Sequence, residues 1–280
     1  MKTNHSSLAF SWFSSLRDAI CKEFEKLELE LTGINSDREP GKFTFKDWQH
    51  NENGGGKIGL MHGRVFEKVG VNVSMVEGTF SSEIRDQIPG TKDSPHFKAC
   101  GISLVSHMHS PLVPSVHMNT RFIQTGKEWF GGGADLNPAI ENSDDTSFFH
   151  SQFQKMCDMH NPSYYERFKN ECDKYFFIKH RNEPRGVGGI FYDYMYSPDF
   201  ERNFTFTKDV GQCFLNTYPQ IVRAHMNKTW SKEQKDTQLF KRGRYTEFNL
   251  IYDRGTKFGL LTGGNPDAIF ISLPPLASWA

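Results

Sequence analysis

Three polar residues alternate along one short segment of the chain. His117, Asn119 and Arg121 occupy every second position between residues 115 and 122. Successive side chains of a β-strand point to opposite faces, so on a strand these three would share one face and mostly apolar residues the other. A titratable ring, an amide and a fixed cation on one face could grip a carboxylate, because a guanidinium offers a bidentate fork. The alternative is an ordinary solvent-facing strand surface.

Histidines form a second pattern. Ser103, His107 and His109 alternate in the same way as the first group, and two histidines on one strand face could be a metal pair. His150 and His180 lie elsewhere, near the ends of expected helices. Histidines scattered in this way more often make hydrogen bonds than bind a metal, and no His-Glu-x-x-His motif is present.

A third candidate lies near the end of the chain. Asp253 and Arg254 follow a segment that we expect to be extended, and they precede Gly255. Adjacent side chains on a strand point apart, but a turn at the glycine could bring both to one site. The alternative is a charged β-turn without a chemical role.

Several common enzyme signatures are missing. Lys57 in the glycine-rich segment 53–57 is followed by Ile58, so the phosphate-loop pattern fails, and residues 186–189 are no dinucleotide fingerprint. No Gly-x-Ser-x-Gly nucleophile elbow occurs. An oxidoreductase built on this sequence would therefore work without a nicotinamide or flavin signature.

Composition limits the class of protein. The 280 residues carry 33 Lys plus Arg and 33 Asp plus Glu, which argues against a nucleic-acid binder. The 25 phenylalanines indicate either an aromatic core or a pocket for a flat ligand. Five widely spaced cysteines predict free thiols in a reducing compartment. No apolar run is long enough for a membrane span, and no targeting segment is evident, so we expect a cytoplasmic protein.

Periodicity predicts the elements that must position these residues. We expect helices over residues 8–27, 144–160, 162–182, 207–227 with a break at Pro219, and 231–244. We expect two short strands within residues 57–79 and another strand that the glycines 131–133 interrupt or end. Further strands are expected over residues 43–48, 97–109, 115–124, 186–195, 248–254, 258–262 and 269–273. Because strands come in groups, the fold class is α+β, in one domain over residues 1–280.

Five runs of this sequence resemble the oxygen-dependent coproporphyrinogen III oxidases. They occur in order along nearly the whole chain, as HGRVFEK at 62–68, VHMNTR at 116–121, WFGGGADL at 129–136, KHRNEPRG at 179–186 and YDRGT at 252–256. The resemblance implies a homodimer built on a large antiparallel β-sheet flanked by α-helices on both faces. It also implies a pocket for a macrocycle that carries four carboxylates.

The resemblance also implies a reaction. Two propionates of coproporphyrinogen III would be oxidatively decarboxylated to vinyls, giving protoporphyrinogen IX for haem biosynthesis and releasing carbon dioxide and hydrogen peroxide. Dioxygen would be the co-substrate, without an organic cofactor, and a divalent metal is left open. Two alternatives remain at this point. One is a tetrapyrrole-binding protein without turnover, and the other is a metal-dependent hydrolase that uses the histidines.

The resemblance also implies roles for individual residues of this sequence. The catalytic positions would be Asp253 and Arg254, with His117 as a proton donor and Asp135 as a further carboxylate. Substrate contacts would come from Ser103, Asn119, Thr120, Arg121, Arg185, Gly263 and Gly264. Metal ligands are sometimes assigned at the positions of His107, His117, His150 and His180. This sequence departs from the family pattern at two positions. The family usually has a basic residue where this chain has Asn265, and it often has an Asp where this chain has His62.

Overall fold

One seven-stranded antiparallel sheet forms the centre of the computed structural model, which describes residues 4–50, 53–80, 88–92, 95–196, 199–261 and 263–279. The strands follow one another across the sheet in chain order and end with β9. They are β1 (Thr44–Gln49), β2 (Asn53–Met61), β3 (Phe66–Thr79), β4 (His96–Met108), β5 (Ser115–Gln124), β6 (Glu128–Asn137) and β9 (Gly188–Met195). The expectation of an α+β fold with a large antiparallel sheet is confirmed.

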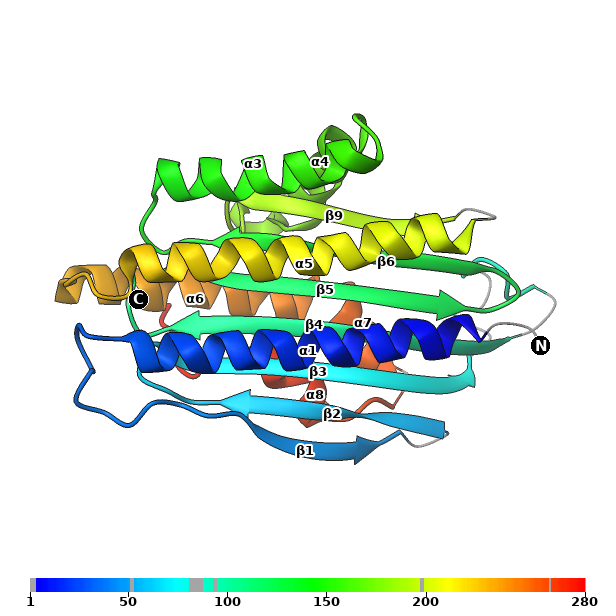
Figure 1. Ribbon diagram of the computed structural model, residues 1–280, viewed down its shortest axis with the longest axis horizontal. Coiled ribbons are helices and arrows are strands. Elements are labelled where there is room, and N and C mark those ends of the chain that lie inside the picture. Colours follow the sequence, from blue (N-terminus) through cyan, green and yellow to red (C-terminus); the bar gives the residue numbers. More distant parts are fainter. Residues whose placement is uncertain are drawn as a thin grey trace.

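Two long helices cover one face of this sheet. Figure 1 shows α1 (His5–Glu30) and α5 (Phe200–His225) lying side by side across it. The buried residues of α1 recur every three or four positions, as expected for a helix with one apolar face. The side chain of Asn4 caps its first turn by accepting from the N–H of Ser7. Helix α5 runs on through Pro219, where we expected a break.

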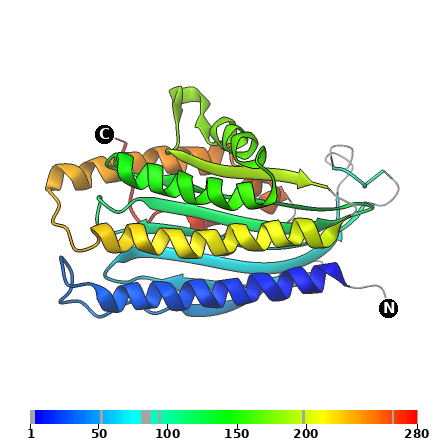
Figure 2. The same cartoon turned by 45° about the horizontal axis from the view of Figure 1, so that its top comes forward.

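The other face and one edge carry the remaining helices. Behind the sheet in Figure 1 lie α6 (Lys232–Ile251), α7 (Arg254–Leu261), α8 (Pro266–Ile269) and the 3₁₀ turn η2 (Phe270–Ser272). Helices α3 (Ser143–His160) and α4 (Tyr164–Tyr175) pack at the β9 edge, as Figure 2 also shows. A short hairpin follows α4, with β7 (Phe177–Ile178), the 3₁₀ turn η1 (Lys179–Arg181) and β8 (Glu183–Pro184). Helices therefore flank both faces, as expected.

The C-terminal region corrects our sequence interpretation. The segments 248–254, 258–262 and 269–273 were expected to be strands, but the structure has α6, α7 and η2 there, with residue 262 outside the described part. Aromatic and branched residues in 245–252 favour a strand locally. The longer pattern is helical, because Gln238, Arg242, Tyr245 and Asn249 are buried at spacings of four, three and four. Helix α4 also ends at Tyr175, before the expected residue 182.

The cysteines are in the state that the sequence predicted. The five cysteines are free, and burial raises the pKa of Cys21, Cys100 and Cys157 to about 12, so these thiols are unreactive at neutral pH. Within the part of the chain that the structure describes, every helix is too short or too polar to cross a bilayer.

Candidate active site

Strand β5 presents the three alternating residues as the sequence predicted. Val116, Met118 and Phe122 are buried in the core, and His117, Asn119 and Arg121 lie on the opposite, half-buried face. In the β5–β6 hairpin Asp135 pairs with His117, Gly133 with Asn119 and Gly131 with Arg121. The register therefore adds a carboxylate and two glycines to the polar face.

A continuous chain of hydrogen bonds crosses this face. The guanidinium of Arg185 donates to Asp135 (2.6 Å), and Nδ1 of His117 donates to the other carboxylate oxygen (2.8 Å). Nδ2 of Asn119 donates to Nε2 of His117 (2.9 Å), and Arg121 Nη1 donates to Asn119 Oδ1 (3.4 Å). Because an arginine can only donate, it fixes the orientation of the amide. His117 therefore carries its proton on Nδ1 and offers a lone pair on Nε2.

Asp135 and Arg185 form a buried ion pair at the inner end of this chain. Both side chains are 2% exposed. Burial alone would raise the pKa of the Asp135 carboxyl, but Arg185 and His117 outweigh it and hold the pKa at about 2, against an ordinary value of 3.8. Asp135 is thus ionised at neutral pH and fixes the ring of His117.

Arg185 makes its contacts within the protein. Its Nη1 donates to Asn249 Oδ1 (3.0 Å), and its guanidinium lies 4.0 Å from the ring centre of Phe176, with Tyr245 and Phe248 also within 5 Å. We expected Arg185 to contact the substrate. The structure places it behind Asp135, enclosed by aromatic rings, where it positions that carboxylate.

Asp193 on β9 links the two outer arginines. Arg121 Nη2 lies 2.8 Å from its carboxylate, and Arg254 Nη2 lies 3.8 Å from the same oxygen. Asp193 also accepts from the N–H of Tyr194 (2.9 Å). Asp193 was not among the residues expected at the site, although it lies in a segment expected to be a strand and alternates with Phe191, which faces the same site.

Gly131 makes room for this pair. A Cβ atom at this position would lie 2.8 Å from Oδ1 of Asp193 and 3.1 Å from Nη2 of Arg121. We expected the glycines 131–133 to interrupt or end a strand, but β6 continues through them to Asn137. The lack of side chains allows the guanidinium of Arg121 to lie across β6 and reach Asp193.

Asp253 and Arg254 reach the same site from the junction of α6 and α7. Tyr175 donates its hydroxyl to Oδ1 of Asp253 (2.9 Å), and Oδ2 accepts from the N–H of Thr256 (2.7 Å) at the start of α7. The guanidinium of Arg254 lies 4.8 Å from the ring centre of Tyr175. A break between two helices, and not the expected strand end, thus places Asp253 against Tyr175 and brings Arg254 to Asp193.

The other expected substrate contacts lie in different places. Ser103 pairs with Asn119 across β4 and β5 and is exposed on the same face. Thr120 is not brought to this face, because its side chain is fully buried on the core side of β5. Gly263 and Gly264 close the C-terminal end of α7, at the opposite end of that helix from Arg254.

The two departures from the family pattern have structural partners. Asn265 caps α8 by accepting from the N–H of Asp267 (2.8 Å). His62 donates from Nδ1 to the carbonyl of Glu67 (2.8 Å). Both side chains therefore stabilise local backbone.

Two of the histidines assigned as metal ligands bind backbone. His107 is fully buried and donates from Nε2 to the carbonyl of Ser272 (2.9 Å). Burial is the main cause that lowers the pKa of His107 to about 3, and the positive charge of Arg242 is the second. His150 donates to the carbonyl of Val187 (3.0 Å) and accepts from the hydroxyl of Tyr165 (2.8 Å). Both are neutral, hydrogen-bonded side chains.

His180 is held in a separate polar cluster. Its Nε2 donates to Glu247 (2.7 Å), and its Nδ1 accepts from the hydroxyl of Tyr252 (2.8 Å). A hydrogen bond from Arg181 is the main cause that lowers the pKa of Glu247 to about 2. Burial acts in the opposite direction, and a hydrogen bond from His180 lowers the pKa further. In the described ranges, no three His, Cys, Asp or Glu side chains form a group that could hold a metal. His107, His117, His150 and His180 therefore do not fit one shared metal site.

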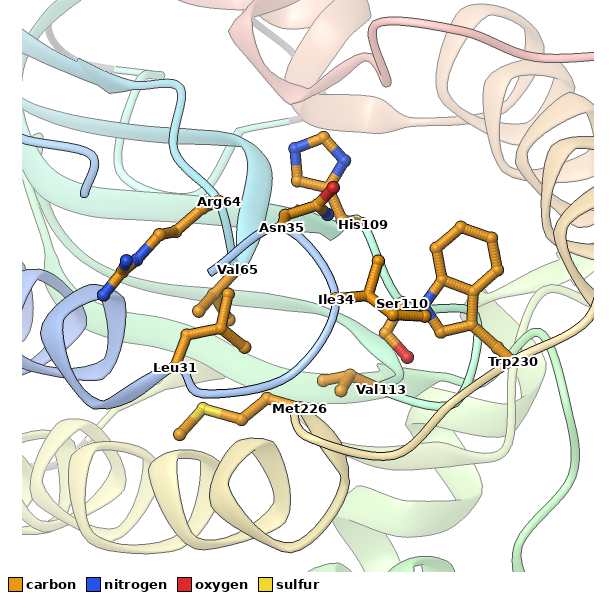
Figure 3. A pocket seen from close by; sticks show the side chains of 10 residues that line it. All are labelled: Leu31, Ile34, Asn35, Arg64, Val65, His109, Ser110, Val113, Met226 and Trp230. Atoms are coloured by element: carbon orange, nitrogen blue, oxygen red, sulfur yellow. The ribbon is translucent and has the colours of Figure 1, made fainter. Parts of the chain in front are cut away.

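A small pocket lies away from the polar face of β5. Figure 3 shows it beside the C-terminal ends of α1 and α5, lined by Leu31, Ile34, Asn35, Arg64, Val65, His109, Ser110, Val113, Met226 and Trp230. Its cavity volume is only about 10 Å³, far below the ~300–1,000 Å³ typical of ligand sites. The guanidinium of Arg64 is occupied with backbone carbonyls, including those of Glu28 and Ser36. We therefore assign the candidate site to the β5 face.

Known proteins match this chain over nearly its whole length. The family described as Coproporphyrinogen III oxidase matches residues 9–280. The oxygen-dependent coproporphyrinogen-III oxidase of Rickettsia akari (strain Hartford) is 54% identical over 275 residues, which are 98% of both chains. Its counterpart from Rickettsia bellii (strain RML369-C) is 52% identical over 280 residues, which are 100% of both chains. Because the match spans nearly every residue, this chain belongs to the coproporphyrinogen III oxidase family.

Proposed function

We propose that this protein is an oxygen-dependent coproporphyrinogen III oxidase of haem biosynthesis. It converts two propionates of coproporphyrinogen III to vinyls and gives protoporphyrinogen IX. Each propionate reacts with one dioxygen and one proton and releases one carbon dioxide and one hydrogen peroxide. The observation that carries this function is the convergence of Arg121 and Arg254 on Asp193, with Tyr175 joining the carboxylate of Asp253 to Arg254.

The site residues divide into binding and proton-handling groups. Arg121 binds a substrate propionate through its guanidinium, which Asp193 already holds across β6. Asp253 accepts the proton of a pyrrole N–H, which makes the ring electron-rich enough to react with dioxygen. His117 handles a second proton at Nε2 when Asn119 releases this nitrogen, since Asp135 fixes the other one.

The wider properties of the protein are part of the same proposal. The chain is one domain over residues 1–280, needs no organic cofactor and works in the cytoplasm, where free cysteines such as these persist. It binds neither nucleic acid nor a membrane, and two copies form a homodimer.

Turnover in air and under anaerobic conditions tests the proposed function. Purified protein mixed with coproporphyrinogen III should release carbon dioxide in air and none without dioxygen. Binding without release in air would instead identify a tetrapyrrole carrier. Metal-dependent cleavage of an ester substrate would identify a hydrolase.

Arg121→Lys should lower kcat/KM by roughly 10–100-fold. Lysine keeps the charge but loses the planar fork, and a hydrogen bond to a charged group contributes about 1.5–3 kcal/mol. Steady-state kinetics with coproporphyrinogen III measure the effect. Arg202→Lys, on the exposed side of α5, is the matched control and should behave as wild type. A wild-type kcat/KM for Arg121→Lys would remove Arg121 from the site.

Turnover should survive exhaustive chelation. The four histidines assigned as ligands sit on separate elements and hydrogen-bond to protein groups, so no step of the proposed reaction depends on them as a metal site. Rates measured before and after dialysis against a chelator should agree. Activity that disappears and returns with a single divalent ion would contradict this prediction.

The homodimer is expected to involve residues from about 245 to 280. This region carries several exposed apolar side chains, namely Leu250, Ile251, Leu260, Leu261, Leu276 and Trp279. Sedimentation at micromolar concentration should give about twice the chain mass. A monomer that still turns over would contradict the prediction.

A further inference from the structure

One tyrosine holds both members of the candidate catalytic pair. Tyr175 is the last residue of α4 and lies 78 positions before Asp253 in the sequence. Its hydroxyl donates to Asp253 Oδ1 (2.9 Å) and accepts from the backbone N–H of Arg254 (3.0 Å). The guanidinium of Arg254 lies over its ring, 4.8 Å from the centre. A single side chain thus contacts the carboxylate, the backbone and the cation of this pair.

The ring of Tyr175 is itself fixed against the sheet. It stacks on Phe191 of β9 with the ring centres 4.5 Å apart and the planes 3° from parallel. Phe176 and Phe248 meet it edge-on, at 4.8 and 5.8 Å. Since Phe191 lies two residues before Asp193, Tyr175 joins the sheet side of the site to the junction of α6 and α7.

The phenol acts as a donor toward Asp253. Burial and then the negative charge of Asp253 raise the pKa of Tyr175 to about 12, so the hydroxyl keeps its proton at neutral pH. The second carboxylate oxygen of Asp253 accepts from the N–H of Thr256 (2.7 Å). A carboxylate has about four acceptor positions, and two remain after these bonds. The fixed carboxylate can therefore accept a further N–H from a bound ligand without turning.

We propose that Tyr175 is a positioning residue of this enzyme, which holds the carboxylate of Asp253 and the guanidinium of Arg254 in the arrangement that meets the substrate. This inference rests on the proposed function, because it concerns the geometry of the same reaction. Tyr175 does not itself exchange a proton with the substrate.

Tyr175→Phe tests the hydroxyl and leaves the ring in place. The stacking on Phe191 and the bond from Thr256 to Asp253 are preserved, so the variant should fold normally. We expect kcat to fall by roughly 10–100-fold, the effect of a lost hydrogen bond to a charged group. KM should stay within about twofold, because Arg121, which binds a propionate, is unchanged. Tyr164→Phe, which removes another hydroxyl from α4, should match wild type.

A double-mutant cycle separates positioning from general stabilisation. Single-turnover release of carbon dioxide is measured for Tyr175→Phe, Asp253→Asn and the double variant. If Tyr175 acts through Asp253, its removal should slow Asp253→Asn by no more than about twofold. An equal loss of rate in both backgrounds would overturn the proposal, as would a wild-type kcat for Tyr175→Phe.

The same measurements distinguish this inference from the proposed function. Wild-type protein that releases no carbon dioxide in air would refute the proposed function and the inference together. Wild-type protein that turns over while Tyr175→Phe turns over equally fast would refute the inference alone. Weaker binding of coproporphyrin III to Tyr175→Phe, by the same factor as the loss of rate, would make Tyr175 a binding residue and also overturn the proposal.

Discussion

Arg185→Met is expected to lower the free energy of unfolding by about 3–5 kcal/mol. The change leaves the carboxylate of Asp135 charged and unpaired in the protein interior, and breaking a buried ion pair costs about this much. Both side chains are 2% exposed, so water cannot replace the lost guanidinium. Methionine has a similar length and fills most of the aromatic enclosure. Urea unfolding followed by fluorescence measures the difference.

Two controls separate the buried charge from other effects. Arg185→Met combined with Asp135→Asn removes both charges and should be more stable than Arg185→Met alone. Lys232→Met breaks an exposed pair with Asp236 on α6 and should cost about 0–1 kcal/mol. If Arg185→Met costs no more than Lys232→Met, Asp135 is not held as a buried anion.

The same pair contributes to the loss of stability in acid. The folded protein lowers the pKa of Asp135 to about 2, against an ordinary value of 3.8. The stabilisation is therefore fully present above the ordinary value and is lost as the pH falls toward about 2. In Arg185→Met the main group that lowers this pKa is missing, so the variant should unfold at a higher pH than wild type.

The polar face of β5 was predictable because it depends on local alternation alone. His117, Asn119 and Arg121 share a face of any strand that includes them, whatever the rest of the fold does. The partners of these residues depend on register, and register follows from hairpins that a sequence pattern does not specify. Asp135 comes to lie opposite His117 only through the β5–β6 pairing, and Asp193 reaches Arg121 only through β9.

The structure holds Asp253 and Arg254 together through Tyr175, but the local structure expected around them was wrong. The alternation of Phe248, Leu250 and Tyr252 favours a strand, whereas burial along α6 follows a helical period. Only the preceding turns of α6, packed on the sheet, decide between the two. Tyr175 gave no signal at all, since its contact with Asp253 spans 78 residues and depends on how α4 meets α6.

Asp253→Asn should slow turnover by on the order of a hundredfold or more, the usual scale for the loss of a general base. The proposed reaction begins when a carboxylate accepts the proton of a pyrrole N–H, and a neutral amide of the same shape has far less basicity. Folding should change little. The amide oxygen can still accept from the N–H of Thr256, and the amide nitrogen can donate to the hydroxyl of Tyr175.

Single-turnover release of carbon dioxide by folded Asp253→Asn with bound substrate is the decisive measurement for this residue. Substrate should still bind, because Arg121 and Arg254 are unchanged, so the loss should fall on the rate and not on the affinity. A wild-type rate would mean that another group takes the pyrrole proton. His117 would then be the next candidate, because Asp135 holds its proton on Nδ1 and its Nε2, which accepts from Asn119, lies on the same face as Arg121.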